Sequence, residues 1–352
     1  ELAKEFGGSY RKILTGTDKS IDKDFRLPEE YRVDVANASD QQILDAIAKL
    51  IGAYITDLGF EQDSEGNYIA SPYDVFLKKN ALPRQPAKNE TITAYNQRLL
   101  KEINNLKTPR FVNNKDGAFE THQQNFVFGE KELSGMKLFF RKGNKEQSGG
   151  NCASCHTAPH FSDFGFHNTG LTQTNYDAVH GNGAFNKLAI PALSVRNKYH
   201  NNYLPATTKH PKASSAFRSP VNSDSPGATD LGLWNVFANP DMPEPQKKLY
   251  NIMCYQARVS DIYDCSDDKL LALTIATFKT PVLRDLGHSG PYMHTGQFNH
   301  ISDSVNFYIT ASALAKSKQL RNADPALSDI SINTTDVAAL VAFVNALNED
   351  YE

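Results

Sequence analysis

Apolar residues recur at helical spacing in several stretches of the chain, and segments rich in Gly, Pro and Asn separate them. Ser39 and Gln42 have the spacing of a capping box, and the apolar residues that follow them recur every three or four positions. This pattern predicts a helix that begins at Ser39. The spacing from Thr91 to Leu106 predicts a second helix with a polar face. Neither helix carries a spacing typical of metal or nucleophile chemistry.

The second half of the chain has a different pattern. The segment Glu130–Phe140 predicts a helix, whereas regular periodicity is weak from Phe161 to Asp268 and predicts a long run of loops. Two further helices are predicted near the end, one capped by Ser302 and one capped by Thr335. The pattern as a whole predicts a mostly α fold.

Composition and charge exclude some classes of function. The chain has 352 residues, of which 40% are hydrophobic and 22% charged, and its net charge is −3. No basic surplus indicates a nucleic-acid partner. The longest apolar stretch, Val337–Leu347, is too short to cross a bilayer, so no transmembrane segment is expected.

The most specific chemical signal is Cys152-Ala-Ser-Cys155-His156. Two thiols at this spacing can add to the two vinyl groups of a haem, and the histidine directly after them can bind the iron. A thioredoxin-like pair would need a strand–helix context, and zinc would need a second closely spaced pair of ligands. A disulfide between these cysteines would close a strained small ring. The motif therefore predicts one covalent haem c.

Haem attachment of this type follows export, so a periplasmic or otherwise exported protein is expected. The chain has 4 Cys, and the remaining two, Cys254 and Cys265, lie in a loop-like segment. They form either a disulfide, as exported proteins commonly contain, or two buried free thiols. We expect residues 1–128 to form a helical linking or docking domain, and residues 129–352 to form a cytochrome c-like haem domain with long loops.

Spacing alone does not identify the second axial ligand of the haem iron. Met242 lies in a Pro-rich loop, a usual setting for a methionine ligand. Histidines 288, 294 and 300 cluster in one segment, and tyrosine is also a known haem ligand.

The segment Phe278-Lys-Thr-Pro-Val-Leu-Arg284 with Gly290-Pro-Tyr-Met-His294-Thr-Gly296 resembles a hallmark of the bacterial di-haem cytochrome c peroxidase/MauG family. Three more segments fit this resemblance, in the family's order: Ser71-Pro-Tyr-Asp-Val-Phe76, the haem motif followed by Phe161-Ser-Asp163, and Phe166-His-Asn-Thr-Gly170. The resemblance covers roughly residues 45–350 and is closest to the family's C-terminal haem domain.

The resemblance implies roles for individual residues. The family's distal ligand lies fourteen residues after the histidine that corresponds to His294, which is Tyr308 here. Peroxidase members have Met at this position and MauG-like members have Tyr, so His156 and Tyr308 are the implied iron ligands. Arg284 and His294 would order the pocket and the haem propionates. Trp234 would relay an electron or hole, or simply pack.

The resemblance also implies calcium, bound through the backbone at Ser289 and Pro291. Family members carry an earlier haem domain with its own Cys-x-x-Cys-His motif, where peroxide reacts. This chain contains one such motif, and residues 1–15 resemble the family segment that follows the earlier domain, so a second haem is expected upstream if the chain is truncated.

Two functions are therefore expected as alternatives. The first is an oxidoreductase that uses peroxide or high-valent iron to oxidise a protein or small donor in the periplasm. The second is a one-haem electron-transfer protein without its own peroxide site. A homodimer is a further candidate assembly.

Overall fold

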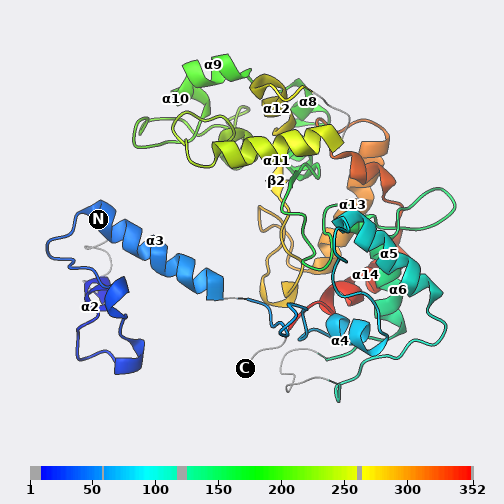
Figure 1. Ribbon diagram of the computed structural model, residues 1–352. Coiled ribbons are helices and arrows are strands. Elements are labelled where there is room, and N and C mark those ends of the chain that lie inside the picture. The colour runs from blue at the N-terminus through cyan, green and yellow to red at the C-terminus, as the bar shows by residue number, and fades with distance from the viewer. Residues whose placement is uncertain (1–8, 58, 117–124, 260–263, 350–352) are drawn as a thin grey trace. The chain divides into compact units, whose positions relative to one another are not determined.

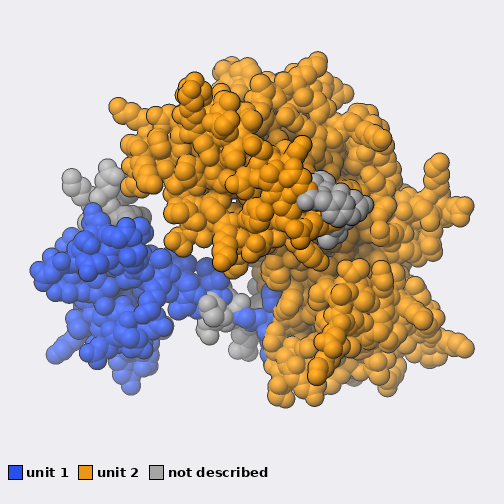
Figure 2. Space-filling model, turned by 45° about the horizontal axis from the view of Figure 1, so that its top comes forward, with its two compact units in different colours: residues 1–61 blue, residues 62–352 orange. Residues whose placement is uncertain are grey.

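The computed structural model describes residues 9–57, 59–116, 125–259 and 264–349 (Figure 1). The chain separates into two compact units, residues 1–61 and residues 62–352 (Figure 2). The described part is mostly helical, which confirms the predicted α-rich fold. Its two short strands pair antiparallel, Phe166 opposite Lys279 and His167 opposite Phe278.

The α-helices have the following bounds: α2 Ser9–Thr15, α3 Asp40–Asp57, α4 Pro72–Lys79, α5 Ile92–Asn105, α6 Glu130–Phe140, α7 Leu171–His180, α8 Ala184–Lys187, α9 Leu193–Lys198, α10 His200–Tyr203, α11 Gln246–Val259, α12 Asp267–Leu273, α13 Ile301–Lys316 and α14 Thr334–Asn345. The strands are β1 Phe166–His167 and β2 Phe278–Lys279. Single 3-10 turns are η1 Lys23–Phe25, η2 Glu29–Tyr31, η3 Cys152–Ser154, η4 Leu233–Asn235, η5 Leu286–His288 and η6 Pro325–Asp329.

Helix α3 belongs to the first unit and begins where the sequence predicts. The backbone N–H of Ser39 donates to Gln42 Oε1 at 2.9 Å, and the N–H of Gln42 donates to Ser39 Oγ at 3.4 Å. This reciprocal pair confirms the predicted capping box.

The larger hydrophobic core of the second unit joins α4, α5, α6 and α14. Phe139 of α6 and Phe343 of α14 contact each other and also Phe161, which follows the haem motif. Helix α6 packs directly on α14 because Gly135 lets the backbone at Ala339 approach closely. This core supports the segment that carries the motif.

A second core lies around Trp234, among the segments from α7 to α12. A disulfide joins Cys254 to Cys265 beside it, which decides between the two states that the sequence left open. The described part of the chain has no helix long and apolar enough to span a membrane.

The prediction of loops from Phe161 to Asp268 was wrong in part. The segment contains α7 and α11, and α11 buries Leu249, Met253 and Ala257 on one face. These residues have helical spacing, but charged and polar neighbours weaken the signal in a window of this length.

The two predicted caps near the C-terminus were also displaced. Helix α13 is capped at His300, whose N–H donates to Asp303, and α14 is capped at Asn333, which accepts from the N–H of Thr335. An acidic residue three positions after each observed cap completes the box.

The boundary between the compact units falls between residues 61 and 62 of the chain, and α4 and α5 share the core of α6 and α14. The predicted division into domains of residues 1–128 and 129–352 remains a prediction.

Candidate haem site

The haem motif forms a tight turn. Cys152–Ser154 are a 3-10 turn, and the backbone N–H of His156 donates to the carbonyl of Cys152 at 2.9 Å. Asn151 precedes the turn in the left-handed conformation, and its side chain donates to the carbonyl of Ala326 at 2.9 Å. Both thiols are free and half-buried.

The ring of His156 is oriented by backbone acceptors. Its Nδ1 lies 3.2 Å from the carbonyl of Phe161 and 3.2 Å from the carbonyl of Pro281. Because carbonyls only accept, Nδ1 must carry the proton, which leaves the Nε2 lone pair for a metal. Burial lowers the pKa of His156 to about 4, so the ring is neutral at pH 7.

The thiols are poor candidates for thiolate chemistry. Burial raises the pKa of Cys152 to about 12, and burial also raises the pKa of Cys155. A thiol that stays protonated is a weak redox nucleophile. A neutral thioether suits this environment better, so the donor set fits a c-type haem.

Tyr308, on α13, faces the same region. Burial is the main reason that the pKa of its hydroxyl is raised, and the neighbouring Cys155, Cys152 and Asp324 raise it further. The side chain also packs against Phe307 and its cluster. The phenol therefore lies near both cysteines of the motif.

The other distal candidates have different surroundings. Met242 belongs to the turn before α11, where its N–H donates to the carbonyl of Asn239 and its carbonyl accepts from Gln246. His288 pairs with Asp285 at 2.8 Å, and His300 caps α13.

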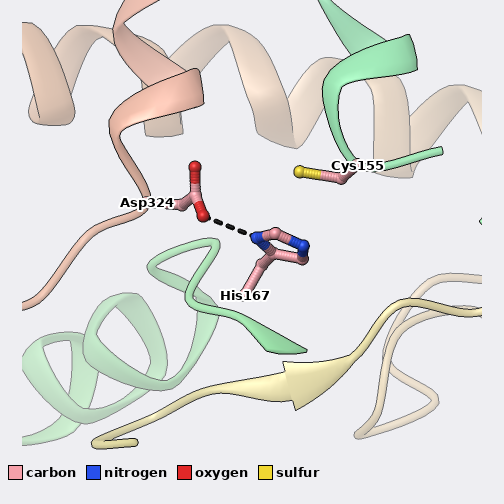
Figure 3. A group of neighbouring side chains, drawn as sticks. All are labelled: Cys155, His167 and Asp324. Atoms are coloured by element: carbon pink, nitrogen blue, oxygen red, sulfur yellow. Dashed lines mark hydrogen bonds and ion pairs between the residues drawn. The ribbon is translucent and has the colours of Figure 1, made fainter. Parts of the chain in front are cut away.

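A cluster of His167 with two aspartates lies beside the motif, and the sequence did not predict it. His167 Nε2 lies 2.8 Å from Asp163, and Nδ1 lies 2.6 Å from Asp324. Figure 3 shows Cys155, His167 and Asp324 converging from separate segments. Burial would lower the pKa of His167, but hydrogen bonds to both carboxylates raise it to about 12, so the ring is charged at pH 7.

The cluster also offers a set of metal ligands in the unmodified chain, because its three ligand atoms lie within 4.8 Å of one another. Thioether formation at Cys155 would remove one of them. The Asp163–His167 spacing was visible in the sequence, but no local signal could connect it to Asp324.

Arg284 is buried and paired with Asp74, and its role in ordering the haem propionates remains a prediction. Its guanidinium makes two hydrogen bonds of 2.9 Å to Asp74, and its Nε donates to the carbonyl of Pro159 at 3.0 Å. It also stacks over Tyr68 at 3.9 Å. The pair thus ties α4 to the loop after the haem motif.

His294 and Trp234 lie in different surroundings. His294 stacks on Phe278 of β2, with ring centroids 3.5 Å apart. Trp234 is only 1% exposed and packs with Phe217 and the buried Arg196 in the second core. These contacts show that Trp234 packs in the second core, and its role as an electron or hole relay remains a prediction.

Ser289 and Pro291, the predicted calcium positions, follow the 3-10 turn η5. The N–H of Ser289 donates to the carbonyl of Leu286 at 3.2 Å. Calcium at these positions remains a prediction.

Comparison with known proteins gives distant relatives. No family model matches the chain. The cytochrome-c peroxidase IdrP1 of Pseudomonas sp. (strain SCT) is 20% identical over 340 residues, which are 96% of this chain and 65% of that protein. IdrP2 of the same strain is 34% identical over 98 residues, 27% of this chain and 23% of that protein.

A third relative, the cytochrome-c peroxidase IdrP1 of Denitromonas iodatirespirans, is 34% identical over 74 residues, 21% of this chain and 18% of that protein. The chain therefore matches less than two thirds of the length of each of these relatives. Their shared name confirms the predicted relationship in its coarser form: the chain is distantly related to proteins named cytochrome-c peroxidase.

Proposed function

We propose that this chain is the haem c domain of an exported oxidoreductase of the cytochrome c peroxidase type, and that it belongs to the MauG-like branch. The observation that carries the proposal is the orientation of His156. Its Nδ1 donates to backbone carbonyls, which leaves the Nε2 lone pair for a metal, and the two cysteines of the same turn form no disulfide. This is the arrangement that a proximal haem ligand needs.

Cys152 and Cys155 would carry the thioethers, and His156 and Tyr308 would hold the iron. A haem bound there would supply an iron that gains and loses one electron. Tyr308 would contribute a hard, anionic oxygen donor, which would stabilise oxidised iron and lower the reduction potential. Because burial raises the pKa of the free phenol, only a strong cation such as ferric iron would hold it as tyrosinate.

Neighbouring residues would seat the group. Half-buried Ile301 and Val305 of α13 pack against the same core as Cys152, and a large apolar ring would cover such surface. The charged His167 would hold the Cys155 side of the turn against Asp163 and Asp324. Arg284 would keep the loop after His156 in place through Asp74.

Ferric iron with a low reduction potential is a weak oxidant by itself, so oxidation of a donor at this site would need peroxide as the oxidant. A tyrosinate donor would support this reaction rather than simple electron delivery, because it favours the higher oxidation states of iron. We therefore infer that the partner is an exported protein or small molecule that gives up electrons. The one-haem electron carrier is the competing function, and a methionine such as Met242 would be its ligand.

Reduction potential separates the two functions. The haem-loaded chain is titrated under anaerobic conditions while its absorption spectrum is recorded. A strongly negative midpoint supports the proposed ligation by Tyr308. A clearly positive midpoint would support a methionine-ligated carrier and would rule out the MauG-like assignment.

A further inference from the structure

Two histidines and one aspartate, all more than 40 positions after the haem motif in the sequence, lie close together. His200 lies on α10, His210 follows it in a turn, and Asp241 lies in the turn before α11. His210 Nδ1 is 2.7 Å from Asp241 Oδ2, and His200 Nε2 is 3.7 Å from the same oxygen. One ligand atom from each residue lies within 4.8 Å of the other two.

The cluster is buried at its centre. The side chains of His200 and Asp241 are 3% and 5% exposed. His200 Nε2 faces two oxygens, the carboxylate of Asp241 and the carbonyl of Pro205 at 3.3 Å. Its Nδ1 is buried and has no hydrogen-bond partner among the described residues. A buried imidazole with an unsatisfied nitrogen is costly unless something binds there.

Hydrogen bonds with neighbouring residues already orient Asp241. Thr207 Oγ1 donates to Asp241 Oδ2 at 2.5 Å, and the N–H of Asp241 donates to Asn239 at 3.0 Å. The N–H of His210 donates back to Thr207 Oγ1 at 3.1 Å. An outer hydrogen bond to a carboxylate is typical of residues that orient a metal ligand.

The charges favour a cation at this point. The nearest positive group in the cluster is Lys209, whose Nζ is 3.8 Å from Asp241 Oδ1, and its side chain is 70% exposed. An exposed lysine contributes little to a buried carboxylate. A divalent ion at these residues would neutralise the carboxylate and bind one nitrogen of each ring. At His200 this nitrogen is Nδ1, because Nε2 points its proton at the carbonyl of Pro205.

We propose that His200, His210 and Asp241 bind a divalent transition-metal ion of the zinc class. Imidazole nitrogens select such ions over calcium or magnesium. The rings are stacked with centroids 3.9 Å apart, so binding requires one ring to tilt. His210 can do so because its side chain is 36% exposed, and its proton moves to Nε2. The ion clamps the turn around Thr207 to the turn around Asp241.

Zinc binding by the haem-loaded full chain tests the proposal. The protein is prepared without a histidine tag, treated with chelator and titrated with ZnCl2 by calorimetry, while native mass spectrometry counts bound ions. Haem loading removes Cys155 as a competing ligand. We expect one zinc per chain, and we expect His210→Ala to abolish it. Thr207→Val should weaken binding by about 10- to 100-fold.

Lys209→Gln is the matched control. It removes a charge beside the carboxylate but no ligand, so zinc should bind it as tightly as the parent protein or more tightly. His210→Ala and Thr207→Val alter a half-exposed ring and one hydroxyl, and their folding is checked by circular dichroism in chelator. The proposal is overturned if the parent protein binds no zinc at micromolar concentration, or if folded His210→Ala binds it unchanged.

Discussion

The Asp74–Arg284 pair shows what a single side chain contributes to the candidate haem site. Arg284 is 3% exposed and Asp74 is also 3% exposed, and two hydrogen bonds of 2.9 Å join them. The same carboxylate accepts from Ser71 Oγ at 2.6 Å and so completes the cap of α4. Removing one partner of such a buried pair leaves the other charge uncompensated.

Asp74→Asn should therefore lower the free energy of unfolding by about 3 kcal/mol. The measurement is urea denaturation followed by circular dichroism. Asp329→Asn is the control, because its pair with Lys142 is exposed and should cost less than about 1 kcal/mol. Equal losses in the two variants would contradict the structural role given to Arg284.

At the residue scale, site residues that are close in sequence could be predicted, whereas pairs that are distant in sequence could not. Cys152, Cys155 and His156 are adjacent, so their chemistry could be predicted from spacing. Asp74 and Asp324 lie 210 and 157 positions from their partners Arg284 and His167, and nothing in the sequence links such pairs. Only the fold brings them together.

At the scale of elements, the contact between α6 and α14 depends on one glycine. A Cβ at Gly135 would lie 1.9 Å from the carbonyl oxygen of Ala339 and 2.8 Å from Cβ of Phe343. Backbone cannot move away as a flexible side chain can, so the two helices would have to separate.

Gly135→Ala should therefore destabilise the protein by at least about 2 kcal/mol, although alanine is the better helix former. Thermal unfolding followed by circular dichroism measures the change. Ser134→Ala, at the exposed neighbouring position, should be neutral or slightly stabilising. A Gly135→Ala protein as stable as the parent would mean that α6 and α14 do not pack as described.

Glu90, which lies just before α5, should make the stability of the protein depend on pH. Hydrogen bonds from Arg98 and from the N–H of Ala87 lower the pKa of Glu90 to about 2, from an ordinary value of 4.5. A carboxyl with a lowered folded-state pKa stabilises the protein above its unfolded pKa, and this stabilisation is lost as the pH falls through about 2.

Glu90→Gln should thus lower Tm at pH 6, and its difference from the parent protein should shrink as the pH approaches 2. Glu146→Gln, at an exposed turn position, serves as the control and should follow the parent protein throughout. A difference in Tm that stays constant from pH 6 to pH 3 would show that Glu90 does not act through its charge.

Elements with strong periodicity were predictable, and elements fixed by tertiary contacts were not. The bounds of α6 agree with the predicted segment Glu130–Phe140, and α5 begins and ends within one residue of the prediction. Helix α11 was missed because its buried face alternates with lysines and polar residues. The packing of its apolar positions in the second core, beside a disulfide, stabilises it.

At the scale of the whole molecule, the second unit has two separate hydrophobic cores, and each lies near a different candidate site. One joins α6 and α14 and is packed against Cys152 of the haem motif. The other surrounds Trp234 in the segments from α7 to α12, and the proposed zinc ligands come from the same segments. The sequence predicted the mostly α class and the family relationship, whereas the separate compact unit of residues 1–61 emerged only from the structure.

The proposed function depends most directly on the ligands of the haem iron. The deciding measurement is the ferric absorption and electron paramagnetic resonance spectrum of the haem-loaded protein, compared with Tyr308→Phe and with Tyr255→Phe, a tyrosine 71% exposed. We predict that the haem stays attached after denaturation, that Tyr255→Phe matches the parent protein, and that Tyr308→Phe changes both spectra. An unchanged spectrum in Tyr308→Phe, or haem that acid and organic solvent extract, would contradict the proposed function.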